Sequence, residues 1–237
     1  MASSWEIVDG KARFAWSESH SAELTPTQPH LPLRILLGDA EPWQVFAAEA
    51  KGGHALAVEE SYVRNPDLIT RFSQSDEDTF GFQLDHRALV GTQPEVIASL
   101  ELWLSVQTAH LDSEPSLRIT CEGPESQATW RRLTHEELAT DSRVSSDSAG
   151  PAALISQAQA QGQTGVWFIE DTDQCHAAVL PSGRDSAATV EMFGHFMEKG
   201  VIRRARMQFH VVSGVASSSL LKTLYKEFCD SPLPLTA

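Results

Sequence analysis

The sequence predicts an α+β protein dominated by β-strands: an antiparallel β-sandwich with two or three short helices, one of them at the C-terminus. Along most of the chain, apolar and polar residues alternate with a period of two, which is the pattern of strands with one buried face. Helical spacing of apolar residues is confined to short segments. Hydrophobic residues make up 41% of the 237 positions, so the chain can form a core. These observations favour a sandwich over a helical or disordered chain.

The predicted strands are separated by turn signals such as Asn65-Pro66-Asp67. The longest strand covers residues 95–109, where apolar positions such as Leu100 and Leu104 alternate with polar ones, so one side faces solvent and the other is packed. The segment Glu41–Ala50 fits a helix or a strand equally. Other predicted strands lie at residues 11–16, 31–37, 54–63, 68–72, 80–84, 117–121, 165–170 and 174–180, with two more inside residues 189–212.

Three segments carry helix signals. Thr134 and Glu137 form a capping box, which starts a short helix. Pro151 and Gly162 are placed as the first-turn proline and the C-terminal glycine of a second short helix. Residues 215–229 form the third, whose single apolar stripe predicts packing against the sheet. That stripe consists of Leu220, Leu221, Leu224 and Phe228.

The domain organisation has two interpretations. A single sandwich-like unit over residues 1–237 is favoured, because β-sandwiches of about 200–250 residues commonly form one domain. The alternative is a β domain at 1–125 and a domain of strands with the C-terminal helix at 165–237, joined by 126–164. Residues 142–150 are rich in serine and lack periodicity, which makes them the best candidate for a boundary.

The charge balance limits the classes of partner. Asp and Glu number 32 against 18 Lys and Arg, so the formal net charge is −14. Nucleic acids and anionic membranes both bind clustered positive charge, so neither is an expected partner. We expect an unidentified small molecule or another protein instead. No stretch approaches about 18 apolar residues and the N-terminal residues lack a signal-peptide pattern, so the expected location is cytoplasmic.

The sequence contains no standard catalytic, metal or cofactor motif. The three cysteines, at positions 121, 175 and 229, are far apart and lack the spacing of a zinc site or a disulfide framework. His135-Glu136 begins a zinc-helix pattern, but the second ligand position is Ala139. Phosphate-binding glycine loops and the Gly-x-Ser-x-Gly nucleophile motif are also absent. We therefore expect no cofactor and no metal site, and assign no catalytic residue.

Residues 189–212 give the candidate ligand site. Lys199-Gly200 fits a two-residue hairpin turn, and the resulting register places Phe193 opposite Arg206 and His195 opposite Arg204. One face of this hairpin is apolar and is predicted to be buried as a unit: Val190, Met192, Phe196, Met207 and Phe209. The other face surrounds an aromatic ring with charged groups, which is typical of a site for a sugar or an organic acid. The residues of this predicted ligand-binding face are Glu191, Phe193, His195, Arg204 and Arg206.

Three short segments resemble an uncharacterised family of bacterial proteins of similar length. They are Glu60–Arg64, Glu198–Arg206 and Pro232–Thr236. The resemblance implies no activity, cofactor or catalytic residue.

The sequence leaves three classes of function open. The first is a binding or interaction protein without catalysis, with a carbohydrate or a small organic acid as the candidate ligand. The alternative is an enzyme that acts on a sugar or small acid, with His195 and Glu191 as an acid–base pair. The third is a structural or assembly component that uses the sheet face or the terminal helix. If the face at 189–212 binds no ligand, it is a sheet exterior whose cross-strand pairs stabilise the strands.

Overall fold

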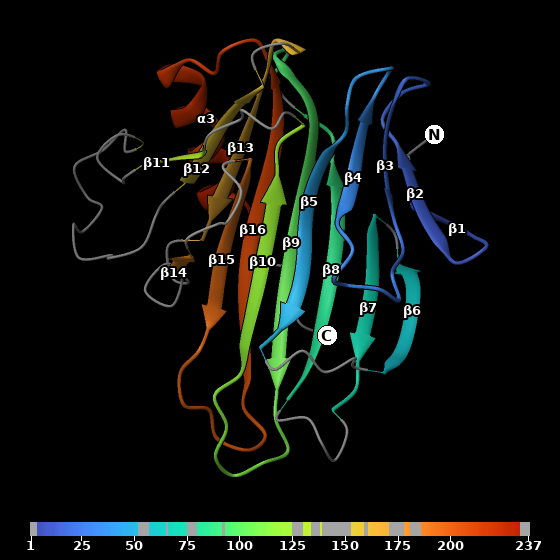
Figure 1. Cartoon of the computed structure of the whole chain (residues 1–237), viewed down its shortest axis with the longest axis vertical. Helices are drawn as coiled ribbons and strands as arrows, with labels where there is room; N and C mark the ends of the chain where they lie inside the picture. Colours follow the sequence, from blue (N-terminus) through green and yellow to red (C-terminus); the bar gives the residue numbers. More distant parts are fainter. Residues whose placement is uncertain are drawn as a thin grey trace.

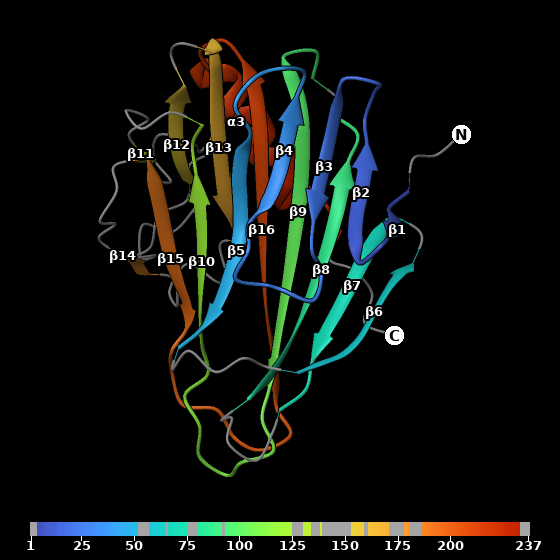
Figure 2. The same ribbon diagram turned by 45° about the vertical axis from the view of Figure 1, so that its right-hand side comes forward.

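The computed structural model describes residues 4–51, 57–64, 66–74, 80–91, 93–124, 130–133, 138, 153–158, 161–170, 178–180 and 186–232. Within these residues the chain forms two antiparallel sheets of eight strands each, which pack face to face (Figures 1 and 2). None of the helical segments in the described part of the chain has the length and apolar character that crossing a bilayer requires.

The first sheet, sheet A, begins with five consecutive strands and continues with three from later in the chain. Its order is β1 (Glu6–Val8), β2 (Lys11–Ala15), β3 (His20–Leu24), β4 (Leu33–Leu37), β5 (Trp43–Ala50), β10 (Ser116–Glu122), β15 (Ala187–Phe193) and β14 (Ala178–Leu180). The segment Glu41–Ala50, which fitted either structure in sequence, therefore contributes a strand.

The second sheet, sheet B, has the long strands β16 and β9 at its centre. Its order is β11 (Trp130–Leu133), β12 (Ala153–Ala158), β13 (Gln163–Ile169), β16 (Ile202–Ser213), β9 (Val96–Gln107), β8 (Gly81–Leu89), β7 (Asp67–Phe72) and β6 (Val58–Arg64). β9 confirms the long strand predicted at 95–109, but the side predicted to face solvent is largely covered, because Ser99, Glu101 and Trp103 are all buried. Each sheet combines strands from both ends of the chain, so the sheets form only after distant segments have come together.

The main core lies between the two sheets, where inward-facing apolar side chains interdigitate. Trp43 of sheet A is fully buried, and its ring lies 5.7 Å from that of Phe209 in sheet B. The Trp43 ring crosses over Gly165, where a β-carbon would come within 2.4 Å of it. Position 165 therefore has room for glycine alone, because a side chain there would occupy the volume of the tryptophan.

The C-terminal helix, α3 (Ser218–Asp230), covers part of the outer face of sheet B (Figure 1). Ser217 caps it by accepting a hydrogen bond from the backbone N–H of Leu220. The predicted helix and its packing on the sheet are confirmed, although Leu220 is only partly buried. The buried residues of α3 are Leu221, Leu224, Tyr225 and Phe228, which form a second core with outward-facing residues of sheet B such as Val166, Phe168 and Val212.

The helix predicted over residues 151–162 is wrong, because Ala153–Ala158 forms strand β12 between β11 and β13. Leu154 belongs to the core between the sheets, whereas Ile155 packs in the second core on the other side. Both faces of this strand are buried, so its sequence lacks the polar alternation that would have identified it. The capping box at 134–137 and the serine-rich segment 142–150 lie outside the described residues. Within those residues, α3 is the one helix with defined bounds, so the expected two or three helices are not shown.

The hairpin predicted at 189–212 is also wrong. β15 pairs with β10 and β14 in sheet A, whereas β16 pairs with β13 and β9 in sheet B. The connection between them crosses from one sheet to the other, and Gly200, in the left-handed region at φ 80°, lies within it. Four of the predicted apolar residues are buried in the common core, because both strands face it: Val190, Met192, Met207 and Phe209. The fifth, Phe196, is 50% exposed on the connection.

Candidate functional site

Glu191 lies on the outer face of sheet A, away from the arginines that were predicted to surround it. Its carboxylate accepts a hydrogen bond from the Ser116 hydroxyl at 2.7 Å and lies 3.3 Å from Lys51 Nζ and 3.6 Å from Arg118 Nε. The hydrogen bond from Ser116, followed by the Lys51 and Arg118 charges, lowers the pKa of Glu191. A carboxylate held ionised in this way is unsuited to donating a proton at neutral pH.

Phe193 and His195 lie at the end of β15. Phe193 has a left-handed backbone conformation, with φ 68°, and its side chain is buried in the core between the sheets. The Nδ1 atom of His195 lies 3.1 Å from the backbone oxygen of Phe193, within hydrogen-bonding distance. Phe193 is therefore buried in place of the exposed stacking surface that was predicted.

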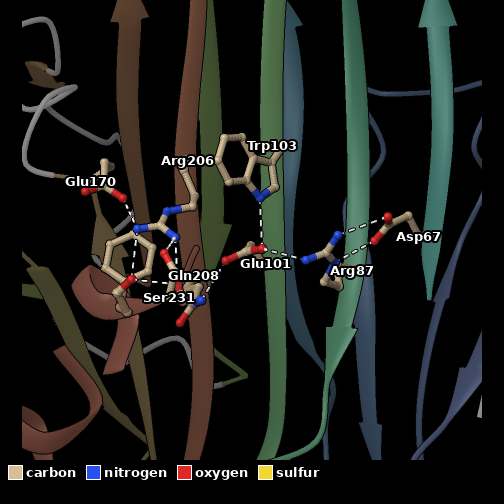
Figure 3. Close-up of polar contacts among 9 residues, drawn as sticks. Asp67, Arg87, Glu101, Trp103, Glu170, Arg206, Gln208 and Ser231 are labelled. Atoms are coloured by element: carbon tan, nitrogen blue, oxygen red, sulfur yellow. Dashed lines mark hydrogen bonds and ion pairs between the residues drawn. The ribbon is translucent and has the colours of Figure 1, made fainter. Parts of the chain in front are cut away.

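Arg206 is buried and anchors α3 to sheet B (Figure 3). Its Nη1 atom donates to the backbone oxygen and hydroxyl of Ser231, at 3.1 and 2.6 Å, and its Nη2 donates to the backbone oxygen of Phe228 at 2.8 Å. The same guanidinium forms an ion pair with Glu170. The carbonyls at a helix C-terminus lack intrahelical partners and carry partial negative charge, so a buried arginine stabilises them. Arg206 thus has a structural role in place of the predicted ligand contact.

Arg204, two residues before Arg206 on the same face of β16, lines a pocket. The pocket has a volume of about 350 Å³ and lies on the outer face of sheet B, across β16, β9, β8, β7 and β6. We call it the sheet B pocket. Its lining residues are Tyr62, Arg64, Ile69, Arg71, Phe82, Gln83, Asp85, Trp103, Ser105, Val106, Gln107, Ile202 and Arg204.

Strand register places the outward-facing residues of this pocket in rows. One row runs through Arg204, Ser105, Gln83, Arg71 and Glu60. The next row runs through Arg206, Trp103, Asp85, Ile69 and Tyr62. Phe82 also lines the pocket, which therefore combines three aromatic residues with charged and amide side chains on a continuous hydrogen-bonded sheet.

The three arginines of the pocket differ in their contacts. Arg71 is occupied: Nη1 lies 3.2 Å from a carboxylate oxygen of Glu60, and Nε and Nη2 both donate to Gln83. Arg64 and Arg204 are exposed, and within the described part of the chain neither forms a hydrogen bond or a close ion pair. These two guanidinium groups remain available to a ligand.

Asp85 is the carboxyl group of the pocket. It accepts a hydrogen bond from Gln83 Nε2 at 2.8 Å. Burial raises the pKa of Asp85, and the negative charge of Asp67 adds to this, while the Gln83 hydrogen bond and the charges of Arg64 and Arg204 act in the opposite direction. A carboxyl with a raised pKa is a candidate proton donor or acceptor in a binding site.

A polar network of Asp67, Arg87, Glu101 and Gln208 occupies the row of sheet B next to that of Trp103 and Asp85 (Figure 3). Arg87 donates from Nε and Nη2 to the two carboxylate oxygens of Asp67, at 2.6 and 3.0 Å. Glu101, 4% exposed, accepts hydrogen bonds from Trp103 Nε1 at 2.8 Å and Gln208 Nε2 at 2.7 Å. Because Trp103 is held by this network, its ring has a fixed position at the edge of the pocket.

A second cavity, of about 250 Å³, lies between sheet B and α3. His210 lines it and is hydrogen-bonded through Nδ1 to the Ser99 hydroxyl at 2.8 Å. Burial lowers the pKa of His210 to about 4, so its imidazole is neutral at pH 7. Among the residues that the structure describes, no group of three or more His, Cys, Asp or Glu side chains is placed to hold a metal ion.

Sequence reasoning missed the sheet B pocket because the pocket depends on strand pairing. Its residues from β6, β7 and β8 lie 117 or more positions before Ile202, the first residue of β16 to line it. The usable signal was the polar face of β9, where the large aromatic Trp103 lies between Glu101 and Ser105. Trp103 lines the pocket, although it is only 8% exposed.

No protein-family model matches the chain, and the search of curated proteins finds no match. Several solved structures share its fold. A candidate aldose 1-epimerase from Klebsiella pneumoniae subsp. pneumoniae matches with a TM-score of 0.56 and 8% identity, over 96% of this chain and 87% of that one. The Slr1438 protein from Synechocystis sp. matches with a TM-score of 0.50 and 10% identity, over 90% of this chain and 96% of that one.

A third similar structure is the α-N-acetylgalactosaminidase NagBb from Bifidobacterium bifidum, as a quadruple mutant. Its TM-score is 0.52 at 9% identity, and the match covers 94% of this chain but 38% of that enzyme. At these identities the similarity establishes the architecture, a β-sandwich built on two large antiparallel sheets.

Proposed function

We propose that this protein binds a carbohydrate in the sheet B pocket. The observation that carries the proposal is the composition of that pocket: the aromatic residues Trp103 and Tyr62 lie beside Arg64, Arg204 and Asp85 in a space of about 350 Å³. Pockets of roughly 300–1,000 Å³ with a few convergent polar groups are typical of small-molecule sites. Sugars present both apolar C–H faces and hydroxyl groups, so they suit a lining of aromatic rings and charged side chains.

The position of the pocket also supports the proposal. It lies on strands of a sheet whose neighbouring polar groups, including Arg87 and Glu101, are held by hydrogen bonds. Residues held on a rigid sheet keep their geometry before the ligand arrives, which lowers the cost of binding. Two of the proteins that share the fold are described by names from sugar chemistry, an aldose 1-epimerase candidate and an α-N-acetylgalactosaminidase.

A second candidate function is catalysis on the bound sugar, and Asp85 is the observation that favours it. Its raised pKa suits proton transfer to or from a sugar oxygen. Arg64 and Arg204 supply fixed positive charge to the same region of the pocket. Such catalysis would be measured as interconversion of sugar anomers, followed by optical rotation with and without the protein, and Asp85→Asn would abolish the acceleration.

Isothermal titration calorimetry with a panel of neutral and acidic monosaccharides tests the proposed binding. We expect at least one sugar to bind, and Tyr62→Ala to weaken that binding by about fivefold or more, because truncation removes an aromatic contact worth about 1 kcal/mol or more. The matched control is Phe196→Ala, which removes an aromatic side chain that is 50% exposed outside the pocket. If no sugar in the panel binds, or if both variants bind like the wild type, the proposal is wrong.

A further inference from the structure

The sheet B pocket has a charge opposite to that of the protein. The whole chain has a formal net charge of −14, yet the pocket is lined by three arginines and one carboxyl group. An acidic protein repels anions over its surface in general, so a local excess of positive charge indicates a site that attracts them.

Two of the three arginines supply that excess. Arg71 is neutralised by Glu60 at 3.2 Å and by the more distant Glu59 at 4.0 Å. Arg64 and Arg204 have no comparable ion pair in the described part of the chain. Both are exposed on the outer face, so holding them there costs little desolvation, and their donors are ready for a ligand.

Arg64 and Arg204 stand on opposite sides of the pocket and act on the same region. β6 and β16 are separated by β7, β8 and β9, so their backbones lie about 19 Å apart at the strand spacing of a sheet. Both guanidinium groups nevertheless line the pocket and influence Asp85, which lies between them on β8. Asp85 supplies at most one negative charge, so the two positive charges of Arg64 and Arg204 leave this region with a net positive charge.

We infer that the ligand of the sheet B pocket is an acidic sugar, with its carboxylate or phosphate group held by Arg204 or by Arg64, on either side of the pocket, and its ring beside Trp103 and Tyr62. The inference rests on the proposed carbohydrate site and names its ligand class. A guanidinium offers two parallel N–H donors to a carboxylate or phosphate, which makes it the best-suited side chain for both groups.

Paired ligands that differ only in the acid group test this inference. Titration calorimetry would compare glucose with glucuronic acid and with glucose 6-phosphate, so that the two acid groups are measured separately. We expect one acid to bind at least about tenfold more tightly than glucose, because hydrogen bonds to charged groups are the stronger ones. Raising the ionic strength from about 0.01 M to about 0.15 M should weaken only the acids, since the screening length falls from about 30 Å to about 8 Å.

Variants connect the preference to the two arginines. At least one of Arg204→Gln and Arg64→Gln should reduce the acid-to-glucose affinity ratio by about tenfold, and both should leave the melting temperature unchanged because both side chains are exposed. The matched control, Arg34→Gln, removes the same charge from an exposed position on β4 of sheet A and should leave the ratio unchanged.

The outcomes separate this inference from the proposed function. If glucose binds as tightly as both acids, or if the arginine variants keep the full preference, the acidic-sugar inference is overturned and the carbohydrate site stands. If neither neutral nor acidic sugars bind, the proposed function itself fails.

Discussion

Replacing Arg206 by lysine tests whether this residue anchors α3 to sheet B. The substitution keeps a positive charge near Glu170 but replaces a planar group, whose Nη1 and Nη2 atoms both donate to the end of α3, with a single ammonium. In the wild type, Nη1 reaches Ser231 while Nη2 reaches Phe228. One ammonium cannot occupy both nitrogen positions, so Arg206→Lys loses at least one set of these contacts.

The expected loss follows from those contacts. Each hydrogen bond from a charged donor contributes about 1.5–3 kcal/mol, and the contact of the guanidinium with the Phe228 ring, at 4.4 Å, contributes about 1 kcal/mol more. Arg206 is 1% exposed, so water cannot replace the lost donor. We therefore expect Arg206→Lys to lower the free energy of unfolding by about 3 kcal/mol.

Urea unfolding followed by tryptophan fluorescence measures this change as a shift of the transition midpoint at constant slope. The control is Arg34→Lys, which makes the same exchange at an exposed position and should change stability by less than about 0.5 kcal/mol. If Arg206→Lys and the wild type unfold at the same urea concentration, Arg206 does not anchor the helix and the reasoning is refuted.

Three further predictions concern packing and pH. Gly165→Ala should lower the free energy of unfolding by about 1–3 kcal/mol, measured by thermal unfolding, because the new β-carbon would lie 2.4 Å from the Trp43 ring. The control Gly91→Ala should leave stability unchanged, because the nearest atom to its β-carbon is 3.4 Å away. Burial lowers the pKa of His86 to about 4. Between pH 6.5 and pH 4 the imidazole is therefore protonated in the unfolded chain but neutral in the folded protein, so the free energy of unfolding falls as the pH drops from about 6.5 to 4. His86→Leu should reduce that fall in urea unfolding at the two pH values; an unchanged fall would contradict it. Because the pKa of Asp85 is raised in the folded protein, its ionisation lowers the free energy of unfolding at pH values above the unfolded pKa of 3.8. Asp85→Asn should therefore melt at a higher temperature than the wild type at about pH 7 and at the same temperature near about pH 3. A lower melting temperature at pH 7 would count against this assignment.

Much of the architecture could be predicted from alternation alone. β9 and α3 were predicted nearly to their bounds, because one has a clear period of two and the other a single apolar stripe. β12 was missed because both its faces are buried and its residues, rich in Ala and Gln, also suit a helix. The sequence pattern of a single strand does not show which other strand or helix packs against each of its faces.

The same limit explains the error at residues 189–212. Val190 and Met207 both face the core, as they would in a hairpin, but they do so from opposite sheets. Alternation specifies which side chains point inward and leaves the pairing of strands undetermined.

The predicted ligand-binding residues were separated for this reason, and Arg204 alone lines the sheet B pocket. Arg206 was recognised as a polar-face residue, yet its partners Phe228 and Ser231 lie more than 20 positions later in the chain. The pocket residues of β6, β7 and β8 became neighbours of β16 only through the order of strands in sheet B.

The most direct test of the account is NMR spectroscopy of the tryptophan indole N–H groups during titration with the tightest-binding sugar of the panel. Trp103 lines the sheet B pocket, whereas Trp43 and Trp167 are fully buried in the core between the sheets. The Trp103 signal, assigned by its loss in Trp103→Phe, should shift progressively with added sugar while the signals of Trp43 and Trp167 stay in place. A sugar that binds without shifting the Trp103 signal would contradict the assignment of the site to this face.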